Sequence, residues 1–247
     1  MGEFSSITRT GKHEPFNLHV ARGYVQGHTP VFVYGYNAAV SSANETVWNG
    51  GGIYAYPTTS TPLNITATTA TDVGVQVQIN GLDRDFNTIS AIVTVNGATT
   101  VTTSNSFYRV QNATVINSIQ PTSNIVIKNT VPQTLGVVAA IDNKTMQFVY
   151  TVPAGYTLYI QRGSISTATE GTNQIVTARL RVRQPSETLF KTAAIVTLNN
   201  QFIPFDFETP VVVTEKCDVE ATAIVSKSQD NAVSAHIEGI LIKNESV

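Results

Sequence analysis

The sequence predicts an all-β protein: two β-sandwich or jelly-roll-like modules preceded by an extended N-terminal arm. Three observations support this prediction. Charged residues make up only 13% of the 247 residues, against roughly 25% in typical domains, and β-branched residues, which favour pleated sheets, are abundant. Segments of alternating apolar and polar residues recur, separated by turn signals every 8–12 residues or so, as in sandwiches and barrels. No amphipathic helix longer than a turn or two is apparent.

Residues 1–45 are predicted to form the arm, ordered mainly by what it contacts. They lack sustained periodicity, and the candidate strand VFVYGY (31–36) is interrupted by Gly35. The following segment, WNGGGIYAYP (48–57), is predicted to be a Gly-rich connection into a short strand that Pro57 ends.

The first β module is predicted over residues 46–120. Its clearest strand is VGVQVQIN (73–80), which places four aliphatic side chains on one face and two glutamines on the other. SAIVTVNGATTVTT (90–103) predicts two strands around Asn96-Gly97, a pair typical of type I′ hairpins. FYRVQNATVI (107–116) is a further strand candidate.

The second module, a jelly-roll-like sandwich, is predicted over residues 121–247. After Pro121 the alternating pattern restarts, and VPAG (152–155) suits a type I turn. The predicted strands are 125–129, 145–153, 156–166, 174–184, 193–199, 202–207, 219–226 and 232–243.

Composition narrows the classes of function. A net charge of −2 gives no broad field to attract nucleic acid or an anionic membrane, so neither is an expected partner. The single cysteine, Cys217, excludes an intrachain disulfide framework. No run approaches the roughly 18 apolar residues of a bilayer span, and the N-terminus has no apolar signal region. We therefore expect a soluble chain made in a cytoplasm.

The segment GLDRDFNTI (81–89) raises the question of a calcium site. Asp83, Asp85 and Asn87 alternate as the first ligands of a helical calcium loop do, but Thr88 and Thr94 occupy the positions that need Gly and Glu. Asp and Asn also cap tight turns through local hydrogen bonds. We predict a turn, with only a weak Ca²⁺ candidate, and no cofactor.

Arg179, Arg181 and Arg183 alternate along TARLRVR (177–183), so they share one face of a strand. This basic stripe is predicted either to contact an acidic partner surface or to be a solvated strand face with acidic neighbours in the same domain. Both alternatives stay open from the sequence.

Aromatic residues gather beside glycines in the N-terminal quarter. They are Tyr34, Tyr36, Trp48, Tyr54 and Tyr56. Such a group can stack sugar rings or form a protein interface, where Tyr and Trp are enriched. We favour the interface because no ligand motif accompanies the cluster.

Catalytic patterns are missing from the sequence. The four histidines and Cys217 have no zinc-site spacing, and no nucleophile elbow, phosphate-binding loop or dinucleotide fingerprint occurs. We expect no enzymatic activity.

Two stretches resemble virion structural proteins of tailed bacteriophages, notably those of marine phages. The first, VGVQVQINGLDRDFNTISAIVTVNGATTVTTSNSFYRV (73–110), has a strand, a GLD turn, a strand ending in NG and a Thr-rich strand leading to RV. The second comprises VYTVPAGYTLYI (149–160), FIPFDFETPVVVTEKCDV (202–219) and VSAHIEGILI (233–242), which resemble a jelly-roll-like module of the same proteins. The resemblance implies a virion component; the region before Trp48 has no counterpart in it.

Together, composition and resemblance predict a head decoration (cement) protein that binds the major capsid protein or other virion proteins. Its arm is expected to lie across neighbouring capsid subunits, and its copies to associate as a trimer. It would reside in the virion after assembly in the cytoplasm of a host bacterium. The alternative is a tail, neck or head-fibre protein, with a host glycan bound through Trp48 and Tyr54.

Overall fold

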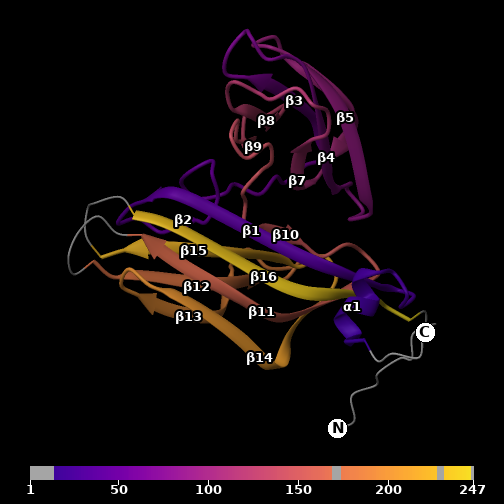
Figure 1. Cartoon of the computed structure of the whole chain (residues 1–247). Coiled ribbons are helices and arrows are strands. Elements are labelled where there is room, and N and C mark those ends of the chain that lie inside the picture. The colour runs from indigo at the N-terminus through magenta and orange to yellow at the C-terminus, as the bar shows by residue number, and fades with distance from the viewer. Residues whose placement is uncertain (1–13, 169–173, 227–230, 246–247) are drawn as a thin grey trace.

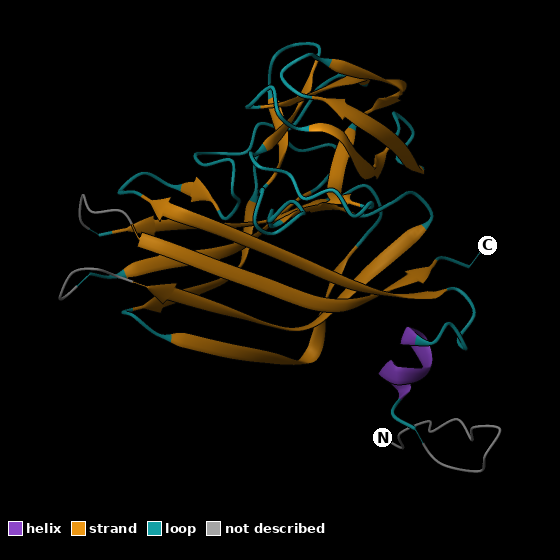
Figure 2. Cartoon of the chain, turned by 45° about the horizontal axis from the view of Figure 1, so that its top comes forward, coloured by secondary structure: helices purple, strands orange, loops and turns teal. Residues whose placement is uncertain are grey.

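The computed structural model describes residues 14–168, 174–226 and 231–245, and this part of the chain is almost entirely β. In Figure 1 it forms a lower sandwich with an upper module above it, and Figure 2 shows the same two layers turned forward. Helix α1 (Phe16–Ala21) is the one helix among the described residues. The prediction of an all-β fold is confirmed.

The lower sandwich consists of two antiparallel sheets. The first contains, in order, β1 (His28–Val40), β16 (Asn231–Lys243), β11 (Tyr156–Ala168) and β14 (Phe202–Val213). The second contains β10 (Val149–Thr151), β15 (Asp218–Val225), β12 (Val176–Arg183) and β13 (Lys191–Leu198), and β2 (Glu45–Thr46) also pairs with β15. β2 and β10 can be counted as one interrupted strand, so the sandwich has eight strands. Renumbered 1 to 8 along the chain, these strands follow the orders 1-8-3-6 and 2-7-4-5 in the two sheets. This is the topology of an eight-stranded jelly roll.

The upper module is inserted between β2 and β10. One of its sheets contains β6 (Val101–Phe107), β3 (Thr61–Ala67), β8 (Ile125–Asn129) and β9 (Thr134–Val138). The other contains β5 (Thr88–Asn96), β4 (Val73–Leu82) and β7 (Arg109–Val115).

The sheets do not follow the boundaries predicted at residues 45 and 120. β8 and β9 come after Pro121 but belong to the upper module, because β8 pairs with β3. β1 comes before residue 45 but pairs with β16 at the other end of the chain. Local alternation identifies strands without saying which distant strand they pair with.

β1 corrects the prediction that residues 28–40 are part of an extended arm. Gly35 does not interrupt this strand: a Cβ there would stand 2.1 Å from the carbonyl oxygen of Val47 and 2.5 Å from the backbone nitrogen of Phe148. The glycine is therefore present because another backbone packs closely against it. Residues 1–13 of the predicted arm lie outside the described residues.

The predicted Asn96-Gly97 hairpin is also corrected. Gly97 adopts a positive φ of 56°, as such a turn needs. However, β5 pairs with β4 and β6 pairs with β3, so the two strands belong to different sheets. The turn is held by the loop between β3 and β4, because Gly97 donates its backbone N–H to the carbonyl of Asp72 at 2.8 Å.

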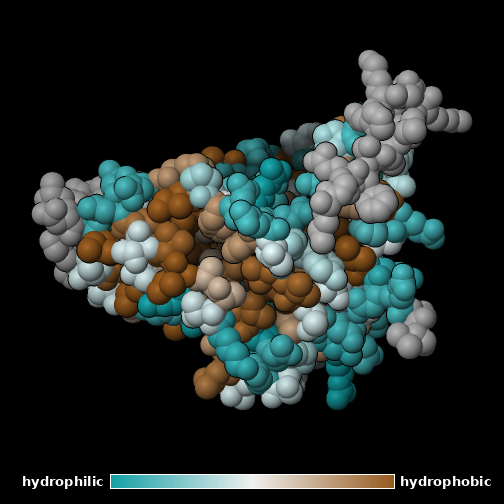
Figure 3. Space-filling model, turned by 90° about the horizontal axis from the view of Figure 1, so that it is seen from below, coloured by the Kyte–Doolittle hydropathy of each residue, from teal (hydrophilic) through white to brown (hydrophobic). Residues whose placement is uncertain are grey.

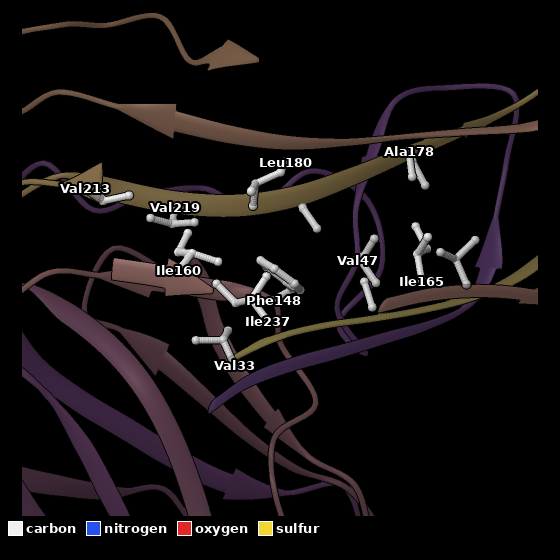
Figure 4. Packing of buried hydrophobic residues seen from close by; sticks show 14 of the residues in the cluster. Val33, Val47, Phe148, Ile160, Ile165, Ala178, Leu180, Val213, Val219 and Ile237 are labelled. Carbon is white, nitrogen blue, oxygen red and sulfur yellow. The ribbon is translucent and has the colours of Figure 1, made fainter. Parts of the chain in front are cut away.

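Each module has its own hydrophobic core. Figure 4 shows the lower core, where Phe148, Leu180 and Ile237 meet between the two jelly-roll sheets. The upper core is built around Phe107, Ile79 and other buried aliphatic side chains. Each such side chain contributes about 1.5–3 kcal/mol by leaving water.

We predict that Gly35→Ala destabilises the protein. The added methyl group would overlap the backbone of Val47 and Phe148, and overpacking of this kind costs about 1–3 kcal/mol or more. Urea unfolding measures the free energy, with Ala38→Ser at an exposed position of the same strand as the control. A neutral Gly35→Ala would show that β1 does not pack on the body.

Candidate functional site at the module junction

Strand β15 presents acidic side chains toward the upper module. Val219, Ala221 and Ala223 point into the jelly-roll core, so Asp218 and Glu220 lie on the opposite face, as the alternation of a strand requires. Both carboxylates are nevertheless buried. Buried charges require partners, and the junction supplies them.

Asp218 joins the two modules. Its Oδ1 accepts from Nε of Arg109 at 2.9 Å and its Oδ2 from Nη2 of Arg109 at 3.2 Å. Arg109 begins β7 of the upper module, and the pair is bidentate, the strong geometry for such contacts. Arg183 of β12 donates Nη2 to Oδ2 at 2.6 Å, and the Thr151 hydroxyl donates to Oδ1 at 2.6 Å. The carboxylate therefore connects β7, β10, β12 and β15.

The remaining donor of Arg109 is also satisfied, because Nη1 donates to the carbonyls of Pro57 and Tyr108, each at 3.0 Å. The pKa of Arg109 is raised: burial lowers it, but the hydrogen bond and charge of Asp218 more than compensate. The guanidinium is a fixed structural cation with no proton to transfer.

Glu220 forms a second buried ion pair, with Arg181 on the adjacent strand. Burial raises the pKa of Glu220, and the opposing effect of Arg181 does not cancel this increase.

The arginine stripe has its acidic neighbours in the same domain. In the register of β12 and β15, Arg181 lies opposite Glu220 and Arg183 opposite Asp218. Arg179 lies opposite Thr222, and no ion pair to it is found among the described residues. Asp218, Glu220 and Arg109 are not among the site residues predicted from the sequence. Asp218 and Glu220 could have been found, because the spacing of two residues between the charges in DVE (218–220) matches that in RVR (181–183). No local pattern indicates Arg109.

The aromatic cluster divides into two groups. Trp48 and Tyr54 are only 3% and 2% exposed, and their rings meet edge to face at 5.1 Å in the upper core. They cannot stack a sugar from solvent, which contradicts the alternative of a host glycan bound through Trp48 and Tyr54. Tyr34 and Tyr36 lie half-buried on β1 of the lower sandwich.

Tyr56 continues the aromatic contacts into the junction. Its ring lies 4.9 Å from Tyr54, and the Arg183 guanidinium stands over it at 4.5 Å. Burial raises the pKa of both Tyr54 and Tyr56. These tyrosines stay protonated and act as packing around the ion pairs.

Asp83 caps its own turn. Its Oδ1 accepts from the backbone N–H groups of Asp85 and Asn87 at 2.8 and 2.9 Å, and its Oδ2 accepts from the Asn87 amide at 3.2 Å. Both carboxylate oxygens of Asp83 therefore accept hydrogen bonds within the turn. Within the described ranges, no three His, Cys, Asp or Glu side chains gather to hold a metal.

A second feature, the open edge, lies between β13 and β14. Each is the last strand of its jelly-roll sheet, and the space between them is a nearly wholly apolar hollow of about 120 Å³. Its lining includes Ala194, Val196, Phe205 and Phe207. Figure 3 shows hydrophobic surface gathered around this hollow on the underside of the molecule.

No family model and no curated protein matches the chain. Among solved structures, a chain of the infectious bursal disease virus Gx strain is 13% identical, with a TM-score of 0.29, over 89% of this chain and 73% of that one. A chain of the empty virus-like particle of Cowpea Mosaic Virus is 11% identical, with a TM-score of 0.25, over 78% and 87%. A chain of the VP2 subviral particle of infectious bursal disease virus is 12% identical, with a TM-score of 0.24, over 89% of this chain and 72% of that one.

All three structures are of virus particles, but TM-scores this low support no conclusion about function. Among the described residues, no helix has the length and hydrophobicity needed to cross a membrane.

We predict that Asp218→Asn is strongly destabilising. It leaves Arg109 and Arg183 without their counter-charge at a buried position, and breaking one partner of a buried ion pair costs about 3–5 kcal/mol. Glu238→Gln, which breaks the exposed pair with Arg162, is the control and should cost at most about 1 kcal/mol. Equal losses in urea unfolding would contradict the conclusion that Asp218 joins the two modules through buried ion pairs.

We also predict a pH dependence from Glu220. Its pKa is raised above 4.5 in the folded chain, so its contribution to the free energy of unfolding is full below that pH and declines as the pH rises through the folded value. The parent protein should therefore lose stability relative to Glu220→Gln, which does not titrate, as the pH increases. Urea unfolding over a pH series measures the free energy of unfolding of both proteins. If the parent instead becomes more stable relative to Glu220→Gln as the pH rises, the prediction is wrong.

Proposed function

We propose that this chain is a virion structural protein and, more specifically, a head decoration protein. The observation that carries the proposal is a jelly roll whose apolar interior is open between two edge strands. Jelly rolls are a recurrent fold of viral capsid proteins, and an uncovered apolar edge is an interaction site. The resemblance to virion proteins of tailed bacteriophages supports the same class.

The open edge is suited to a second copy of this chain. Ile195 on β13 is 58% exposed, and Phe202 and Val212 on β14 are exposed by similar amounts. Covering such side chains contributes about 25 cal/mol per Å² of apolar surface. These side chains alternate with residues that line the hollow or pack in the core, so it is the outward faces of both edge strands that gain from being covered.

Charge favours a head-to-tail contact between copies. Arg179 neighbours Ile195 across the β12–β13 pairing, whereas Asp206 and Glu208 lie exposed on β14. No ion pair to any of these three is found in the described part of the chain. The β13 rim of one copy thus complements the β14 rim of the next, and head-to-tail contacts that close form a ring, here proposed as a trimer.

The capsid contact of the arm is proposed for residues 1–13 only, because residues 14–45 include α1, β1 and β2 of the folded body. Deleting residues 1–13 removes none of the described strands. If the trimer still binds capsids after this deletion, the contact belongs to the body instead.

We predict that the parent chain sediments as a trimer and that Ile195→Lys sediments as a monomer, because a charge on the apolar rim cannot be buried there without a partner. Ile92→Lys is the matched control: Ile92 is also exposed, at 62%, but lies on β5 of the upper module. Analytical ultracentrifugation separates the species. A monomeric parent or large closed shells would contradict the decoration trimer.

Charge exchange tests the head-to-tail arrangement. Arg179→Glu and Asp206→Arg should each weaken the trimer, and the double variant should restore it. Lys128→Glu, on β8 of the upper module, should have no effect. Failure of the double variant to recover would exclude this pairing of rims.

A further inference from the structure

A polar cleft lies beside the buried ion pairs, open to solvent at the junction of the two modules. It consists of two adjoining hollows, of about 430 and 240 Å³. Thr58, Phe86 and Tyr108 line both hollows. The larger adds Arg84 from the Asp83 turn, and the smaller adds Lys216 from the lower sandwich. Neither module alone forms the cleft.

Two residues that line the cleft have strained backbones. Phe86 and Lys216 have φ values of 66° and 64°, and the other non-glycine residues with positive φ among those described are asparagines. Asparagine tolerates this region, whereas a bulky side chain there is an outlier, and such strain tends to occur at functional sites.

One loop holds both strained residues. Ala154 donates its N–H to the carbonyl of Phe86 at 2.9 Å, and Lys216 donates its N–H to the carbonyl of Val152 at 2.8 Å. The fold thus fixes an aromatic ring and a cation at the two sides of the cleft.

The middle of the cleft is aromatic. The rings of Phe86 and Tyr108 meet edge to face at 5.3 Å. The Arg109 guanidinium lies over Tyr108 at 4.1 Å and fixes that ring. Both rings are only partly buried, so they provide apolar surface at a solvent-accessible position.

Among the charged residues that line the two hollows, cations outnumber carboxylates: Arg84, Arg109, Arg183 and Lys216 against Glu187 and Asp218. Asp218 is saturated by Arg109, Arg183 and Thr151, and Glu187 pairs with Lys191. Arg84 and Lys216 have no ion pair within the described residues. These two cations lie in different hollows, with the aromatic pair shared between them. The lining also includes the hydroxyl-bearing residues Thr58, Thr59, Ser60 and Thr188.

We propose that this cleft binds an acidic saccharide. Aromatic rings pack against the C–H face of a pyranose, hydroxyl groups bond its hydroxyls, and the separated cations pair with carboxylate or sulfate groups carried on successive sugars. A small inorganic anion would not span both hollows. A neutral saccharide would leave both cations without partners. The inference does not depend on trimer formation or on a position in the virion.

Isothermal titration calorimetry of the full chain with a galacturonate oligosaccharide tests the proposal. The neutral galactose oligosaccharide of the same length and inorganic sulfate are the comparison ligands. We expect binding of the acidic oligosaccharide, with both comparison ligands far weaker. Absence of binding, or equal affinity for the neutral oligosaccharide, overturns the proposal.

Variants locate the site. Arg84→Gln and Lys216→Gln should each weaken binding by roughly 10- to 100-fold, the loss expected for one charge-assisted hydrogen bond. Lys128→Gln removes an equal charge from β8, away from the cleft, and should leave affinity unchanged. Phe86→Asn keeps a residue that tolerates positive φ but removes the ring, so it should fold and bind more weakly. Equal losses in Lys128→Gln, or none in the cleft variants, would overturn the assignment.

Discussion

The buried carboxylate of Asp218 is the interaction on which the arrangement of the two modules depends. It receives the Arg109 side chain from the upper module and the Arg183 side chain from the lower sandwich, at a position almost free of solvent. Desolvating these charges is expensive, and only complete pairing offsets the cost. A displaced upper module would leave Arg109 without its counter-charge, and Asp218 would keep only Arg183 as an ionic partner. The interaction therefore specifies one geometry, whether or not it adds net stability.

Because the buried charges at the junction serve to position the modules, the candidate interaction sites are on the surface. Arg109 pairs with Asp218, Asp218 also accepts from Thr151, and Tyr56 is enclosed, so these groups hold the junction together. Two surfaces of the described structure carry groups that a partner or ligand could cover. One is the apolar edge between β13 and β14, and the other is the cationic, aromatic cleft whose lining comes from both modules. The first needs a protein neighbour and the second a polar ligand.

Alternation of apolar and polar residues was enough to predict the all-β class and most strands. It failed where a residue's role depends on distant backbone: Gly35 was interpreted as a break because the close approach of Val47 and Phe148 is invisible locally. For the same reason the sequence places β8 in the wrong module. It also suggests that Trp48 could bind a ligand at the surface, although this side chain is buried. The arginine stripe was recognised, but Arg109 lies 109 positions from Asp218, beyond any local pattern.

The proposed decoration role is tested most directly by immunogold electron microscopy of intact virions, with antibody against this chain. We expect gold distributed evenly over the head, because a decoration trimer occupies repeated positions on the capsid exterior. Gold confined to the tail or neck would contradict that role. Absence of the protein from both the virion surface and the denatured lysate would contradict any structural role in the virion.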